Sequence, residues 1–161
     1  MLTRKSDTLT VGLVAAIVIA LDQWAKSWIV KHLMPGESRM VINGWLKWTY
    51  QQNTHGAFGF FGNNTLLLVV MALVVLAVFW LAFKDSAHKS LLVRIAFGMI
   101  VGGAIGNIAD RFHFGFVVDF VDCYGLWPHL FWQNIFNTAD ACITTGVGLL
   151  IISGLVTRRR A

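Results

Sequence analysis

The feature that most constrains this chain is a series of four long apolar stretches separated by polar segments. The second stretch, Thr65–Phe83, contains no charged residue, and the others carry only isolated charges. About 20 apolar residues are enough to cross the hydrocarbon core of a bilayer as a helix. The sequence therefore predicts a mainly α, polytopic membrane protein that forms a single domain over residues 1–161. Its four transmembrane helices are expected at about residues 10–30, 65–83, 91–109 and 135–156.

The amino-acid composition is also that of a membrane protein. Apolar residues make up 57% of the chain and charged residues 13%, with a mean hydropathy of +0.65. A soluble domain carries about 25% charged residues. The net charge of +5 does not indicate nucleic acid binding, because the basic residues form short clusters beside apolar stretches and no groove-sized basic face.

The N-terminal stretch has a second interpretation. Arg4 and Lys5 precede an apolar run, and Ala25-Lys26-Ser27 is an acceptable small-x-small site, so a cleaved signal peptide is an alternative. We interpret the stretch as a retained span, because it carries Asp22 and Lys26 and because three further apolar stretches follow.

Lysine and arginine are unevenly divided between the two sides of the predicted bundle. One side carries eight of them and the other side five. The eight are Arg4, Lys5, Lys84, Lys89, Arg94, Arg158, Arg159 and Arg160, and the five are Lys26, Lys31, Arg39, Lys47 and Arg111. Because cytoplasmic flanks carry the basic excess, we expect the first side, with both chain termini, to be cytoplasmic.

The opposite, outer side carries most of the acidic and aromatic residues. The acidic residues there or at that membrane edge are Asp22, Glu37, Asp110, Asp119, Asp122 and Asp140. The tryptophans there are Trp24, Trp28, Trp45, Trp48, Trp127 and Trp132. Tryptophan favours the headgroup level of a bilayer, so the outer loops are expected to rest on the membrane surface. Glu37 and Asp122 are interpreted as solvated loop residues.

The outer loops show signs of local structure. Asn43-Gly44 lies between the apolar runs Met40–Ile42 and Trp45–Trp48, a pattern that predicts a β-hairpin with a two-residue turn. We expect a small sheet platform on the outer side. The second outer loop, residues 111–134, is rich in aromatic residues. Its stretch Cys123–Gln133 is expected to form a surface loop or a short helix that could serve as a lid.

Two ionisable residues lie toward the outer half of the first predicted span. An aspartate at the centre of a transmembrane helix costs about 2.5–3.5 kcal/mol, so such groups need partners or a function. Asp22 and Lys26 are spaced i, i+4, share one helix face and can pair. We favour a structural ion pair over a direct role in a site.

A second polar cluster lies at the outer end of the third predicted span. Asn107, Asp110 and Arg111 are three to four residues apart. Asp110 and Arg111 are adjacent, so each is expected to pair with a group on another element and to support a site without performing chemistry. The small residues of Gly102–Gly106 predict that another helix approaches closely here.

The third cluster is the strongest candidate for chemistry. Asp119 follows Val117-Val118 in the second outer loop, and Asp140 begins the fourth span one turn after Asn137. The chain between them is long enough to bring both aspartates together at the membrane surface. Two close carboxylates share a proton, so they can act as acid and base on water and a peptide bond. The alternative is that the two are unrelated carboxylates at helix ends, where aspartate is a common cap.

Other chemistries fit the sequence less well. The histidines show no metal-ligand spacing on a helix and the two cysteines show no metal or paired motif, so neither a metal nor a cofactor is expected. These residues are His32, His55, His88, His113, His129, Cys123 and Cys142. The leading alternative function is a small proton- or ion-coupled transporter using the same buried carboxylates. The acids gather on one side and Thr65–Phe83 is uncharged, which disfavours it. A non-catalytic assembly or anchor protein is the third possibility.

Five motifs, in this order, resemble those of the lipoprotein signal peptidases. This bacterial family, also called signal peptidase II, consists of membrane aspartic peptidases. The motifs are Asp22-Gln23-Trp24-Ala25-Lys26, Asn53–Phe58, Gly102–Arg111, Val117-Val118-Asp119-Phe120 and Phe136-Asn137-Thr138-Ala139-Asp140. The resemblance covers nearly the whole length of the chain, and the shared order of the motifs makes chance agreement far less plausible than for any single motif.

The resemblance implies a specific function and site. It implies cleavage of a prolipoprotein signal peptide just before a diacylglyceryl-modified cysteine, without metal or cofactor. Asp119 and Asp140 match the catalytic dyad. The other matching positions are the site-lining residues Asn53, Asn107, Arg111 and Asn137 and the support residues Asp22, Lys26 and Asp110. The family implies a multi-pass protein of the bacterial inner membrane, with the site on its outer face. The expected partners are the modified precursor and membrane lipid, without nucleic acid, and the expected state is a monomer.

One motif departs from the family pattern. The segment reads Asn53-Thr54-His55-Gly56-Ala57-Phe58, with His55 where the family has glycine and Gly56 where it has alanine. A bulky residue at a position that needs positive φ would reshape the loop. The departure therefore calls the contact of Asn53 into question and leaves the dyad unaffected.

Overall fold

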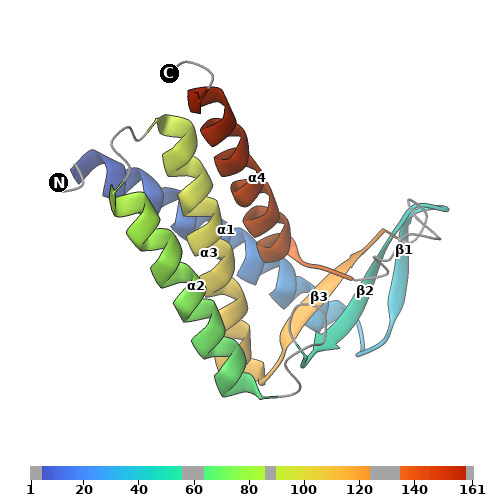
Figure 1. Ribbon diagram of the computed structural model, residues 1–161. Coiled ribbons are helices and arrows are strands. Elements are labelled where there is room, and N and C mark those ends of the chain that lie inside the picture. Colours follow the sequence, from blue (N-terminus) through green and yellow to red (C-terminus); the bar gives the residue numbers. More distant parts are fainter. Residues whose placement is uncertain (1–4, 56–63, 86–89, 124–134, 159–161) are drawn as a thin grey trace.

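The computed structural model describes residues 5–55, 64–85, 90–123 and 135–158, and the chain folds into four helices and a small sheet (Figure 1). The helices are α1 (Lys5–His32), α2 (Thr65–Asp85), α3 (Leu91–Phe114) and α4 (Thr138–Arg158). The strands are β1 (Ser38–Ile42), β2 (Leu46–Asn53) and β3 (Val117–Asp122). The sheet lies at one end of the helices, and the start of α1 and the end of α4 lie toward the other end.

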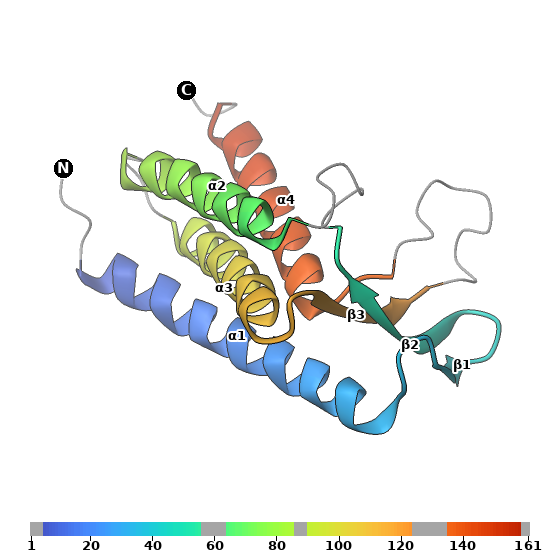
Figure 2. The same cartoon turned by 90° about the horizontal axis from the view of Figure 1, so that it is seen from below.

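The four helices correspond to the four predicted spans, with α3 packed against each of the other three. In Figure 2 α3 lies between α1 and α2. Two helices, over Ser6–His32 and Leu91–Phe114, are long and apolar enough to cross a membrane. The apolar segments in the described parts of α2 and α4 are shorter, Leu66–Val78 and Thr138–Gly154. The prediction of four complete spans therefore remains a prediction.

The fourth helix begins later than the sequence predicted. The predicted span started at residue 135, whereas α4 starts at Thr138. Phe136 instead forms an isolated antiparallel bridge with Val121, and its carbonyl accepts hydrogen bonds from the N–H groups of Phe120 and Val121 at 3.0 and 2.7 Å. The segment before α4 is thus extended because it pairs with β3.

Glycines allow the helices to approach closely, as the sequence predicted for Gly102–Gly106. A Cβ at Gly102 would lie 2.7 Å from the carbonyl oxygen of Ala15 in α1, and one at Gly103 would lie 2.6 Å from that of Ala139 in α4. Any larger residue at either position would push α3 away from its neighbour. The small residues therefore bring the polar ends of α1, α3 and α4 together.

The predicted hairpin is present, but its turn differs from the prediction. Ile42 pairs with Leu46, so the turn has the three residues Asn43, Gly44 and Trp45 in place of the expected two. Gly44 has φ +79°, a left-handed conformation that glycine adopts without strain. A bulge in β1 between Met40 and Ile42 accompanies the longer turn and shifts the register.

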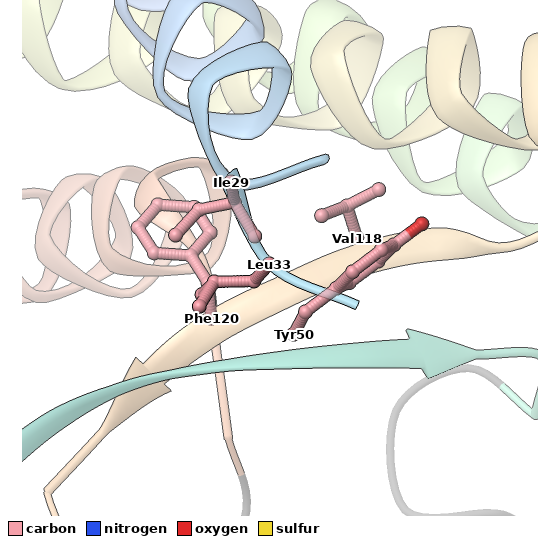
Figure 3. Packing of buried hydrophobic residues seen from close by; sticks show 5 residues of the cluster. All are labelled: Ile29, Leu33, Tyr50, Val118 and Phe120. Carbon is pink, nitrogen blue, oxygen red and sulfur yellow. The ribbon is translucent and has the colours of Figure 1, made fainter. Parts of the chain in front are cut away.

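A third strand places Asp119 in the sheet. Val117–Asp122 was expected in a loop, but it forms β3 and pairs antiparallel with β2 in the order β1-β2-β3. Val118 and Phe120 pack with Tyr50 of β2 against Ile29 and Leu33 at the end of α1 (Figure 3). This apolar contact fixes the sheet to the helices and holds Asp119 at their junction.

Asp122 is not the solvated loop residue that the sequence suggested. It lies in β3, where its side chain is 17% exposed. Its Oδ2 lies 3.3 Å from Lys47 Nζ and accepts a hydrogen bond from Thr49 Oγ1 at 3.0 Å. The sequence did not reveal this role because both partners lie on β2, far away along the chain.

Candidate active site

Lys26 is buried between two aspartates and an asparagine. Its Nζ lies 2.8 Å from Asp22 Oδ2 and 2.9 Å from Asp110 Oδ2, and it donates to Asn107 Oδ1 at 2.9 Å. Lys26 is 2% exposed and both aspartates are fully buried. The predicted Asp22–Lys26 ion pair is confirmed, and so is the expectation that Asp110 pairs with another helix. All three N–H donors of the ammonium have acceptors, so the cluster is well matched.

The two carboxylates of this cluster also accept backbone hydrogen bonds from other elements. Asp22 Oδ1 accepts from the N–H of Ala139 at 2.9 Å, at the start of α4. Asp110 Oδ2 accepts from the N–H of Val118 at 3.0 Å, in β3. The cluster around Lys26 thereby fixes the two segments that carry Asp140 and Asp119.

Gln23 completes this cluster and was not among the predicted site residues. Its Nε2 donates to Asp110 Oδ1 at 2.9 Å and to the carbonyl oxygen of Gly106 at 3.2 Å. The available signals were its place in the motif Asp22–Lys26 and its polar side chain inside an apolar stretch. Gln23 links α1 to α3 without adding charge.

Asp119 is held by two side-chain amides. Asn53 Nδ2 donates to Asp119 Oδ2 at 2.9 Å, and Asn137 Nδ2 donates to Asp119 Oδ1 at 2.7 Å. The contact of Asn53 therefore persists despite the altered motif. The N–H of His55 donates to Asn53 Oδ1 at 3.2 Å, so the support comes from the backbone and not from the unusual side chain. Gly56, the other altered position, lies outside the described residues.

Asp140 is positioned by a capping box at the start of α4. Asn137 Oδ1 accepts from the N–H of Asp140 at 2.9 Å, and Asp140 Oδ2 accepts from the N–H of Asn137 at 3.3 Å. This reciprocal pair satisfies two backbone donors at the helix start and fixes the carboxylate. Asn107 Nδ2 donates to Asp140 Oδ1 at 2.8 Å. Asp140 therefore also has the helix-capping role that the sequence analysis gave as the alternative to chemistry.

Asn137 joins the two aspartates into one network. It is fully buried, and its Nδ2 donates to Asp119 Oδ1, to Asn107 Oδ1 at 3.1 Å and to the carbonyl of Val118 at 3.3 Å. Its Oδ1 and N–H meanwhile bind Asp140. One asparagine therefore contacts both candidate catalytic carboxylates, which brings α4 and β3 together.

The electrostatics of Asp119 are those of a proton carrier. Burial, and then the nearby charge of Asp140, raise the pKa of Asp119 from 3.8 to about 7, although the hydrogen bonds from Asn53 and Asn137 oppose the shift. A carboxyl with a pKa near 7 can hold or release a proton at neutral pH.

The remaining predicted residue, Arg111, lies within electrostatic range of Asp119, Asp140 and Asp110. Its Nη1 donates to the carbonyl oxygen of Asn107 at 3.3 Å, within its own helix. The expected interaction with other elements is therefore electrostatic, with Asp119 and Asp140. Within the described ranges, no group of three or more His, Cys, Asp or Glu side chains is arranged to hold a metal ion. All nine predicted site residues thus gather where α1, α3 and α4 meet the sheet.

Comparison with known proteins places this arrangement in a family. The family profile described as signal peptidase (SPase) II matches residues 14–156. A lipoprotein signal peptidase of Syntrophomonas wolfei is 39% identical, over 89% of this chain and 91% of that protein. One of Chlorobium phaeobacteroides is 43% identical, over 87% and 92%. A solved structure described as a bacterial membrane enzyme is 32% identical and superposes with a TM-score of 0.81, over 91% of this chain and 87% of that one. The chain therefore belongs to the signal peptidase II family.

Proposed function

We propose that this protein is an aspartic peptidase that cleaves the signal peptide of lipoprotein precursors, with Asp119 and Asp140 as its catalytic dyad. The observation that carries the proposal is the hydrogen-bond network that joins these two carboxylates. Neutral amides donate to both of them, and the pKa of Asp119 is raised to about 7. Family membership gives the transporter alternative no support.

The geometry suits hydrolysis by a shared proton. The ionised carboxylate takes a proton from water as the water oxygen attacks the scissile carbonyl carbon. The protonated carboxylate donates a hydrogen bond to the carbonyl oxygen, and a proton then passes to the leaving amine as the C–N bond breaks. Asn53, Asn107 and Asn137 orient the carboxylates, and Arg111 adds positive charge nearby. Asp22, Lys26 and Asp110 hold the elements that carry the dyad.

The site lies where a membrane-bound substrate could reach it. The family is one of membrane enzymes, and the helices expose large apolar side chains such as Leu13, Leu66 and Ile151. Four spans in the bacterial inner membrane, with both termini cytoplasmic and the sheet on the outer face, agree with the basic flanks. They also agree with the start of α1 and the end of α4 lying opposite the sheet. On the hairpin, Met40, Val41, Ile42 and Trp45 are exposed, which favours contact with the membrane surface.

The substrate is a precursor whose cysteine carries diacylglycerol. Its acyl chains would stay in lipid beside the helices while water reaches the peptide bond at the sheet. A single copy of the chain supplies all nine residues of the site, so a monomer is sufficient. The proposal requires neither metal nor cofactor.

The decisive test replaces Asp119 and Asp140 singly by asparagine and follows cleavage of a purified diacylglyceryl-modified precursor. Removal of an acid or base at a reacting centre costs about 10²- to 10⁴-fold in rate, so each variant should lose at least that. Asp122→Asn is the matched control, because it changes an acid of the same strand that touches neither carboxylate. Near-parental cleavage by either dyad variant, inserted normally, would refute the assignment. Inhibition by a metal chelator would point to a metal mechanism.

A further inference from the structure

The edge of β2 that faces away from β3 carries unpaired backbone groups beside the site. β1 pairs with β2 only as far as Ser38 and Thr49. One residue further, Tyr50 still exchanges hydrogen bonds with the preceding turn, since its N–H donates to Glu37 and its carbonyl accepts from Gly36. Beyond Tyr50, β2 continues through Gln51 and Gln52 to Asn53 with pairing only to β3.

The orientation of Gln52 follows from the contacts of its neighbours. Tyr50 directs its N–H and carbonyl away from β3, and backbone direction alternates along a strand, so Gln52 directs both groups the same way. Val118, opposite Gln52, agrees with this: its N–H binds Asp110 and its carbonyl binds Asn137, so neither points at β2. Among the described residues, the N–H and carbonyl of Gln52 have no backbone partner.

A groove follows this edge. It has a volume of about 350 Å³ and is lined by Pro35, Gly36 and residues 49–52 of β2. Gln51 and Gln52 are exposed, and most of the exposed lining of the groove is apolar. Gln52 is followed in β2 by Asn53, whose side chain contacts Asp119. An exposed edge with unpaired N–H and C=O groups is a template for an additional strand.

We propose that the lipoprotein precursor binds here as an added β-strand, with its polar segment after the cleavage site paired to the backbone of Gln52. This inference rests on the proposed function. The segment before the cleavage site is the apolar signal peptide, which belongs with the helices. The unpaired backbone N–H and C=O of Gln52 lie in the sheet, outside the helices, and suit the extended segment that follows. Main-chain pairing gives affinity with little dependence on sequence, which suits an enzyme whose substrates differ after the cleavage site.

Strand geometry sets the distance between this pairing and the scissile bond. Neighbouring strands lie about 4.8 Å apart, so a strand added at the outer edge of β2 lies roughly 10 Å from β3 and Asp119. At about 3.3 Å per residue, the paired residue lies about three residues beyond the cleaved bond. The pairing therefore orients the substrate at a distance and leaves the dyad uncovered.

The enzyme-side test removes the backbone donor of Gln52. Gln52→Pro deletes the N–H at an edge position where β2 loses no ladder bond to β3, and Gln52→Ala keeps the N–H and removes only the side chain. With a long precursor, Gln52→Pro should lower kcat/KM about three- to tenfold, mostly through KM, whereas Gln52→Ala should stay near parental. With a precursor that ends one residue after the modified cysteine, all three enzymes should cleave alike. An equal loss on both precursors would show damage to the site and overturn the pairing.

The substrate-side test leaves the enzyme unchanged. Precursors carrying a single N-methylated amide at successive positions after the cysteine are compared with the unmethylated precursor. Pairing predicts a loss about three residues after the cleaved bond, with the adjacent positions tolerant, because only alternate amides face a neighbouring strand. A uniform effect, or none, would overturn the proposal while normal cleavage of the unmethylated precursor upholds the proposed function. Failure to cleave the unmethylated precursor would instead refute the function itself.

Discussion

Two pairs of aspartates lie in linked clusters in this protein, and they differ in the groups that surround their carboxylates. Asp22 and Asp110 share the ammonium of Lys26 at 2.8 and 2.9 Å. Asp119 and Asp140 are held by neutral amides from Asn53, Asn107 and Asn137. The ammonium of Lys26 supplies a positive charge to the first pair, whereas the amides around the second pair supply hydrogen bonds without charge. This difference supports the proposal that the first pair is scaffold and the second performs acid–base chemistry.

The same comparison explains why the two pairs lie so close together. Asp22 binds the N–H of Ala139 beside Asp140, and Asp110 binds the N–H of Val118 beside Asp119. Each scaffold aspartate thus fixes the backbone next to one member of the dyad. Asn107 also binds both Lys26 and Asp140, which links the charged cluster directly to the dyad. On the proposed assignment, the positions of the dyad depend on contacts with the cluster around Lys26.

The largest expected effect comes from removing the shared cation. Lys26→Met leaves two buried carboxylates without their ammonium, and loss of one partner from a buried ion pair costs about 3–5 kcal/mol. We expect poor accumulation in membranes and a strongly lowered thermal midpoint in detergent. Lys31→Met, on an exposed position of the same helix, is the control and should change stability by less than about 0.5 kcal/mol. Equal stability of the two variants would contradict the scaffold role of Lys26.

Replacing Asp119 is expected to raise the stability of the protein, whereas replacing Lys26 lowers it. Its pKa is raised from 3.8 to about 7, so the folded state binds a proton more tightly than the unfolded chain. The associated stability is present below about pH 4 and is lost as pH rises through about 7. Asp119→Asn removes this pH-dependent loss of stability, and the raised pKa corresponds to about 4 kcal/mol. The gain is reduced because the amide cannot accept the hydrogen bonds of both Asn53 and Asn137. We expect an inactive variant that is about 1–3 kcal/mol more stable at pH 8 and gains less at pH 5.

Thermal unfolding of both proteins in detergent at the two pH values measures this difference. Asp122→Asn serves as the control, because Asp122 lies on the same strand but pairs with Lys47. A stability difference between Asp119→Asn and the parent that is independent of pH would show that Asp119 does not carry the raised pKa. In that case the two aspartate pairs would not differ in their electrostatics as proposed.

The predicted site residues are side chains in ordered motifs, and the structure brings them together. All nine meet at one junction, although they come from five separate segments. The Asp22–Lys26 pair followed from helical spacing alone. The link between Asp119 and Asp140 through Asn137 did not, because the intervening chain can follow many paths. Only the resemblance to a family raised that pair above two unrelated carboxylates.

The sequence predictions that were wrong or missing concern contacts made by backbone groups or by partners distant along the chain. The hydrogen bonds from Ala139 and Val118 are donated by backbone N–H groups, so residue types do not predict them. The run Val117–Asp122 is rich in β-branched residues, a strand signal, but its partner β2 is distant along the chain, so it was assigned to a loop. Asp122 was misjudged for the same reason. A contact that depends on spacing within one helix can be predicted from the sequence. A contact that depends on how two distant strands pair cannot.

The smallest expected effect tests how closely the scaffold pair is packed. A Cβ at Gly106 would lie 2.6 Å from Asp22 Oδ2, so Gly106→Ala must displace the carboxylate that binds both Lys26 and Ala139. Overpacking of this kind costs about 1–3 kcal/mol. We expect lower stability together with slower cleavage, because the displacement reaches the start of α4 beside Asp140.

Gly148→Ala makes the same chemical change in α4, where a Cβ would meet nothing within 4 Å. It should leave cleavage at the parental rate and stability unchanged or slightly higher, since alanine favours the helix. Stability and cleavage are measured for both variants in the same detergent. Slower cleavage by Gly106→Ala alone would show that the scaffold aspartate positions the dyad through α4. Parental cleavage by Gly106→Ala at reduced stability would mean that the two pairs of aspartates act independently.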